Sequence, residues 1–252
     1  MKNYLVIPVA KCNKSVQGAA HAGPNFYNFY EKYAEMQIKS AEKNLKGLDE
    51  VKIIDGEFES TEDLFEHIFH YVYDLAHAEE CNILQAMADT LYIRETEIFG
   101  KYTDFSLFGL NPGINLHPSA HPFQLESVRY WPHAMESGLW EHAKKLWEEP
   151  ILDKQNTWGY EMVMYTALFY KQRAGFYLDK DNLIKHLEAT KHLARKMVSG
   201  YEGQNTLTSE QHGKYTWDVC SIESASILEF SATRGHESQL AEMQKYYNKF
   251  ID

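Results

Sequence analysis

The chain has 252 residues, a formal net charge of −11 and a sequence pI of about 5.5. This length suits one large domain or two small ones, and an aromatic content of 14% excludes long disordered stretches. The acidic balance disfavours nonspecific binding to nucleic acid and to anionic membranes, because such binding depends on Lys and Arg.

Three short apolar runs in the first half predict buried strands, at residues 3–10, 50–56 and 82–88. The run at 3–10 is too short for a membrane span and lacks a cleavage-site pattern, so we interpret it as a strand and not as a signal peptide. Nothing else in the sequence approaches the length of a membrane span, which predicts that the protein has no membrane partner.

Helical patterns separate these strands. One helix is predicted over 25–45, with Gly47 closing it, and a capping signature at Ser60 opens another over 60–80. Alternation of strands and helices at this spacing predicts a parallel sheet. Ligands of such sheets bind beyond the carboxyl ends of the strands, and Asp89 directly follows the third predicted strand.

The second half of the sequence does not continue this alternation of strands and helices. Its patterns predict short strands, then mainly helices, then a last strand and helix. The predicted strands are 104–110, 125–131 and 224–230. The predicted helices are 134–148, 158–171, 181–199 and 236–250.

Four segments, taken together, resemble GT-A glycosyltransferases, in particular the glycogenin-type group and its bacteriophage-encoded relatives. The segments are ILQAMADTL, VRYWPHAMESGLWEHAKKL, WGYEMVMYTALFYKQ and ILEFSATRGHESQLAEMQ. They follow one another in the order of the family over almost the full chain. The resemblance implies a single α/β GT-A-like domain over 1–252, with a mostly parallel central sheet and a helical second half. Its nucleotide-binding half would be 1–110 and its acceptor-side half 111–252.

The same resemblance implies a function. Members of the family transfer a sugar from a nucleotide-sugar, usually a UDP-sugar, and a bound Mn²⁺ or Mg²⁺ neutralises the leaving diphosphate. The acceptor stays open between a modified DNA base, a protein and a glycan, although the acidic charge weakens the case for DNA.

The family pattern also implies roles for particular residues. Asp89 would bind the metal and act in catalysis together with Glu161, and Glu229 would serve as a second metal ligand. The donor nucleotide would contact a further set: Val9, Ala10, Lys11, Arg234 and Gly235.

The sequence departs from the family at several of its motif positions. Met87 stands where the first family acid is expected, Glu229 where a His is expected, and Thr166 where an Asn is expected. A thioether is a poor ligand for hard Mn²⁺ or Mg²⁺, so we expect weak metal binding or none. Because alternate strand residues share a face, we expect an acid at position 87 to lie on the same side as Asp89. An alternative is an inactive relative that acts as a binding or partner subunit.

A second alternative does not depend on the family. His67, His70, Asp74 and His77 recur along one face of the predicted helix over 60–80. Neighbouring His side chains can share a metal ion, which would make the chain a helical metal-binding protein. A solvated helix face explains the same pattern.

Cysteine usage indicates the compartment. Cys12, Cys81 and Cys220 are odd in number, and their spacing matches no zinc motif. Free thiols are typical of a reducing compartment, so we expect a cytoplasmic protein. The sequence leaves a homo- or hetero-oligomer open.

Overall fold

The computed structural model describes most of the first hundred residues and several shorter stretches after them. The described residues are 1–14, 27–100, 106–108, 128–131, 133, 138, 140–141, 144–145, 195–199, 226–231 and 236–252. The predicted helix over 158–171 and the loop regions around it lie outside these residues, and so does most of the predicted helix over 134–148.

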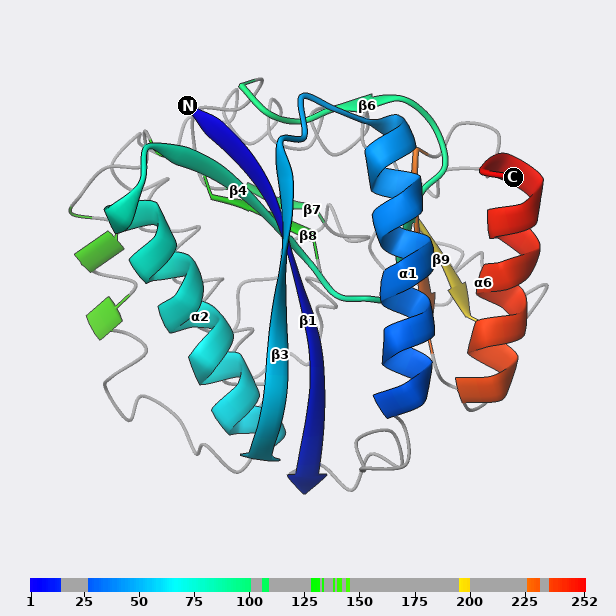
Figure 1. Ribbon diagram of the computed structural model, residues 1–252, viewed down its shortest axis with the longest axis horizontal. Coiled ribbons are helices and arrows are strands. Elements are labelled where there is room, and N and C mark those ends of the chain that lie inside the picture. Colours follow the sequence, from blue (N-terminus) through cyan, green and yellow to red (C-terminus); the bar gives the residue numbers. More distant parts are fainter. Residues whose placement is uncertain are drawn as a thin grey trace, which may run out of the picture.

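A five-stranded sheet of order β3-β1-β4-β8-β7 forms the centre of the described part (Figure 1). Strands β1, β3 and β4 run parallel, as the alternation of strands and helices predicts. The bounds of the five strands are Lys2–Lys14 for β1, Glu50–Ser60 for β3, Cys81–Ala86 for β4, Ser106–Phe108 for β7 and Val128–Trp131 for β8.

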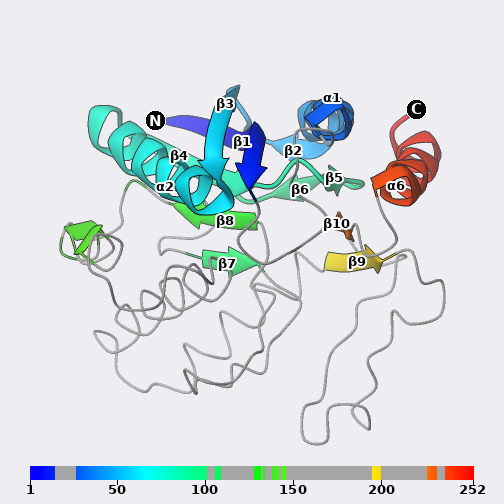
Figure 2. The ribbon, with the colours of Figure 1, turned by 90° about the horizontal axis from the view of Figure 1, so that it is seen from below.

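The two crossover helices, α1 (Tyr27–Asn44) and α2 (Thr61–Ala78), cover opposite faces of this sheet (Figure 2). The alternation of β1 explains this arrangement, because Leu5 and Ile7 pack in a cluster with α1 while Tyr4 packs in a cluster with α2. Both β1 faces are therefore buried, which accounts for its near-continuous apolar sequence.

We call the two groups of buried residues the α1 cluster and the α2 cluster. The α1 cluster includes Leu5, Ile7, Val9, Tyr33, Met36, Leu84, Leu91, Tyr92, Leu228, Phe230 and Met243. The α2 cluster includes Tyr4, Val6, Cys12, Ile54, Phe65, Phe69, Val72, Ile83, Trp131 and Trp140.

Local signals set the ends of the helices. Ser60 caps α2, since its side chain accepts a hydrogen bond from the backbone N–H of Asp63. Gly47 follows α1 closely with a φ of 77°, in the left-handed region that favours glycine. The Ser60 cap agrees with the sequence prediction, whereas Leu45 and Lys46 form a short strand between α1 and Gly47, so Gly47 does not close the helix as predicted.

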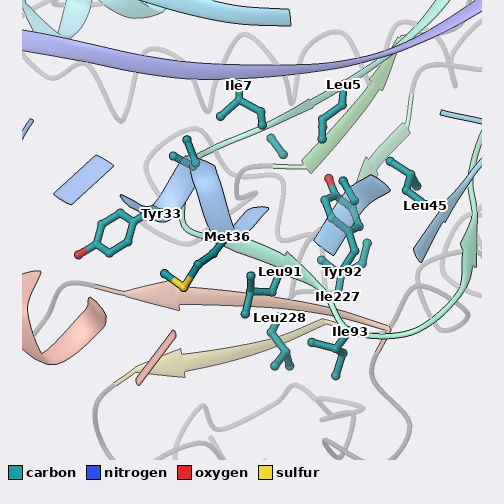
Figure 3. Packing of buried hydrophobic residues seen from close by; sticks show 14 of the residues in the cluster. Leu5, Ile7, Tyr33, Met36, Leu45, Leu91, Tyr92, Ile93, Ile227 and Leu228 are labelled. Atoms are coloured by element: carbon teal, nitrogen blue, oxygen red, sulfur yellow. The ribbon is translucent and has the colours of Figure 1, made fainter. Parts of the chain in front are cut away.

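A second sheet, of order β5-β10-β9, packs under α1 beside the last helix, α6 (His236–Phe250). Its strands are β5 (Thr90–Tyr92), β9 (Arg195–Ser199) and β10 (Ile227–Ser231). Figure 3 shows Leu5 and Ile7 on one side of the α1 cluster and Leu91, Ile227 and Leu228 on the other. A short pairing of β2 (Leu45–Lys46) with β6 (Thr96–Glu97) completes the described strands.

Two fold predictions are wrong in part. The central sheet is only partly parallel, because β8 runs antiparallel to both β4 and β7. The predicted helix over 181–199 is wrong at 195–199, which form β9 and pair parallel to β10, and the rest of it lies outside the described residues. Pairing with β10 supplies backbone hydrogen bonds that a weak local helical pattern does not outweigh. The structure establishes a mixed α/β fold with a partly parallel sheet.

Of the helices among the described residues, none combines the length and the apolar character needed to cross a membrane.

Buried thiols make the stability of the fold sensitive to alkaline pH. Cys12 and Cys81 are free and buried, and burial raises the pKa of each thiol from 9.0 to about 11. Because the folded pKa is raised, the stabilisation is complete below pH 9 and is lost as the pH rises toward 11. Between pH 9 and 10, we expect the free energy of unfolding to fall by about 1 kcal/mol per thiol, measured by urea denaturation.

The matched control is a variant that carries both Cys12→Ala and Cys81→Ala. Its free energy of unfolding should fall less over the same pH interval, although it starts lower because of the lost packing. An equal slope in both proteins would contradict this assignment.

Candidate functional site

Asp89 lies in a turn between β4 and β5, at the carboxyl end of β4, as the sequence predicts. Its backbone carbonyl accepts a hydrogen bond from the N–H of Phe230 in β10 at 3.0 Å. Its side chain is partly buried, and Oδ2 accepts a hydrogen bond from Nε2 of Gln239 in α6 at 3.0 Å. Two elements that follow much later in the chain therefore hold this carboxylate in place.

Two tyrosines of α1 complete the surroundings of Asp89. Burial is the main cause that raises the pKa of Tyr30 and of Tyr33, and the charge of Asp89 raises both further. The Tyr33 hydroxyl donates to the backbone carbonyl of His236 at 2.9 Å. The phenols therefore stay protonated at neutral pH and lie close enough to Asp89 to feel its charge.

A group of four rings connects α1 to the start of α6. The His236 ring stacks against Phe29 at 5.5 Å between centroids, and Tyr30 meets it edge-on at 5.5 Å. Tyr33 contributes the fourth ring, with its hydroxyl 3.3 Å from Nδ1 of His236. His236 is only 4% exposed, so these rings hold the N-terminal end of α6 against α1, next to Asp89.

The C-terminal part of β1 lies next to the end of β4, the strand that Asp89 follows. The ladder between β1 and β4 ends at Val6, whereas the ladder between β1 and β3 continues to Lys14. Val9 and Ala10 therefore lie within β1 and not at its exit. Among the described residues, no ladder partner occupies the β4 side of this stretch.

Lys11 contacts β3. Its Nζ donates to Oε1 of Glu57 at 2.9 Å and lies 5.1 Å from the centroid of the Tyr27 ring. The hydrogen bond to Glu57 is the main cause that raises the pKa of Lys11. An exposed ion pair of this kind contributes little free energy, so Lys11 can exchange Glu57 for an anionic ligand at small cost.

The other predicted site residues are described only in part. Glu229 lies in β10 with its Cα opposite Thr90, so the fold brings its backbone next to the Asp89 turn. Arg234, Gly235 and Glu161 lie outside the described residues, and their roles stay predictions.

The expected relation between Met87 and Asp89 is wrong. β4 ends at Ala86, and the chain turns at Ala88 and Asp89, so the alternation of a strand does not extend over these positions. Met87 packs against the α2 cluster, whereas Asp89 contacts Gln239 of α6. An acid placed at position 87 would therefore not share a side with Asp89.

The contact between Gln239 and Asp89 does not suit a divalent cation. Hard cations need several oxygen ligands with lone pairs directed at them, but Gln239 directs an N–H group at the carboxylate. Among the described residues, no three His, Cys, Asp or Glu side chains form a group that could hold a metal ion.

The histidines of α2 each have a different neighbour. His67 packs against the ring of Phe58 at 5.3 Å, and His70 against the ring of Phe69 at 5.6 Å. His77 stacks on Tyr73, with Nδ1 at 2.8 Å from the Tyr73 carbonyl oxygen. These contacts give no support to the helical metal-binding hypothesis.

Sequence reasoning missed Gln239, Tyr33 and His236 as members of the site. They come from helices that the sequence predicts correctly, but their relation to Asp89 depends on contacts between residues far apart in the chain. The available signal was position: His236 and Gln239 are polar residues that fall on the same face as the apolar stripe of the last helix, at its N-terminal end.

No model of a protein family and no curated protein matches this sequence.

Proposed function

We propose that the protein binds a nucleotide-sugar, with UDP as the nucleotide, where β1 and β4 end, and transfers the sugar to an acceptor. The observation that carries the proposal is Asp89, a carboxylate that Gln239 orients at the carboxyl end of a parallel strand. The ordered resemblance to GT-A glycosyltransferases supports it. The neighbouring edge of β1 adds backbone groups for a nucleobase.

Each group has a chemical task in this proposal. The Asp89 carboxylate accepts a hydrogen bond from a hydroxyl of the ribose or the sugar, since hydroxyls are the donors that a nucleotide-sugar offers to an anion. The backbone of Val9 and Ala10 meets the nucleobase. Lys11 and Arg234 neutralise the diphosphate as it leaves, a task that cations at fixed positions perform well.

Glu161 is the acceptor-side group of the proposal. A carboxylate beside the acceptor hydroxyl would take its proton as the new glycosidic bond forms. The carbon of the sugar then exchanges its bond to the diphosphate oxygen for a bond to the acceptor oxygen. The acceptor is a modified DNA base, a protein or a glycan.

The test is a panel of UDP-sugars, with and without Mn²⁺. We expect at least one UDP-sugar to raise the melting temperature and to be hydrolysed slowly without an acceptor. EDTA should change the thermal shift and the hydrolysis rate by less than about twofold each, because the described donors around Asp89 do not fit a cation. No thermal shift and no turnover with any donor would contradict the proposal, and binding without turnover would favour the inactive partner subunit.

A further inference from the structure

We propose that Gln239 keeps a divalent cation away from Asp89, because its amide N–H group takes the place on the carboxylate that a metal ion would occupy. The inference deepens the proposed function, because it states how the site works without a metal ion. It rests on the proposed function only for the claim that Asp89 belongs to a donor site. Its evidence is independent of any nucleotide.

The orientation of the Gln239 amide is set by two acceptors. Nε2 donates to Oδ2 of Asp89 at 3.0 Å and to the backbone carbonyl of Phe230 at 2.8 Å. A flipped amide would place Oε1 against both of these oxygens, with lone pairs facing lone pairs. The side chain therefore presents hydrogen, and not oxygen, to Asp89.

Burial strengthens this arrangement. Gln239 is 4% exposed, and within the part of the chain that is described no hydrogen-bond partner faces Oε1. A cation next to Oδ2 would meet the positive end of the amide dipole, which is electrostatically unfavourable at low dielectric.

The backbone reinforces the same geometry. Phe230 donates its N–H to the Asp89 carbonyl and accepts from Gln239 through its own carbonyl. Asp89, Phe230 and Gln239 thus form a closed set of hydrogen bonds that spans the β4–β5 turn, β10 and α6. Moving Gln239 aside to admit a metal would break two of these bonds.

The experiment measures binding of Mn²⁺ alone, by electron paramagnetic resonance of the free ion, to the full chain and its variants. Gln239→Glu should bind Mn²⁺ about tenfold more tightly or better, because it replaces the donor by a second carboxylate beside Asp89. Gln239→His, which offers an imidazole nitrogen without added charge, should gain affinity in the same direction.

The matched control uses Gln244, which is exposed on the same helix and bonds Asn248. Gln244→Glu adds the same charge away from Asp89 and should leave Mn²⁺ binding as weak as in the natural chain. Circular dichroism confirms that each variant is folded. Folded Gln239 variants without a gain over Gln244→Glu would overturn the inference.

A further arm does not depend on how the Gln239 variants fold. If the natural chain binds Mn²⁺ and Asp89→Asn abolishes that binding, the cation reaches Asp89 and the inference is wrong. UDP is titrated separately on the same samples. Absence of UDP binding would contradict the proposed function alone, whereas the Mn²⁺ measurements decide the role of Gln239.

Discussion

Replacing Asp89 by Asn should lower the affinity for the preferred UDP-sugar about tenfold or more, with the fold intact. Hydrogen bonds to a charged acceptor contribute about 1.4 kcal/mol more than neutral ones, and this difference corresponds to a factor of about ten. The amide oxygen of Asn can still accept the bond from Gln239, which is why we expect no large loss of stability. Isothermal titration calorimetry at one salt concentration measures the affinity.

The control for this variant is Asp74→Asn. Asp74 is exposed on α2, and the substitution removes the same charge from a helix that covers the other face of the sheet. It should leave the affinity unchanged. If Asp89→Asn also binds as tightly as the natural chain, Asp89 does not belong to the donor site.

Replacing Trp131 by Ala should reduce the free energy of unfolding by about 3–5 kcal/mol, the range for large buried aromatic side chains. Trp131 is fully buried in β8, stacks on Trp140 at 5.1 Å and meets the edge of Phe69 at 6.2 Å. Its loss would leave a cavity between the sheet and α2. Urea denaturation followed by far-UV circular dichroism gives the free energy.

A comparison within the same sheet makes this result specific. Ile53 lies in β3 and is 48% exposed, so Ile53→Ala should change the free energy of unfolding by no more than about 0.5 kcal/mol. A loss below about 1 kcal/mol for Trp131→Ala would show that β8 is not packed against α2 as described here.

Much of the first half of the fold follows from local patterns. Apolar runs placed β1, β3 and β4, and helical periodicity with the Ser60 cap placed α1 and α2. These signals are local, because a strand buried on both faces needs apolar residues throughout and a helix end needs a cap. The antiparallel direction of β8 was not predictable in this way, since it depends on which strand edge the chain meets after a long connection.

The candidate site likewise has one part that the sequence determined and another that only the tertiary structure decided. By itself, the sequence determined that a carboxylate, Asp89, follows the third parallel strand, because an apolar run and its polar end are local features. Only the tertiary structure decided which groups surround this carboxylate. Gln239 reaches Asp89 across 150 positions of sequence, and Met87 packs on the α2 side although it lies two positions from Asp89. The physical reason is that β4 ends at Ala86, so the turn that follows is shaped by packing against α1, β10 and α6 and not by the alternation of a strand.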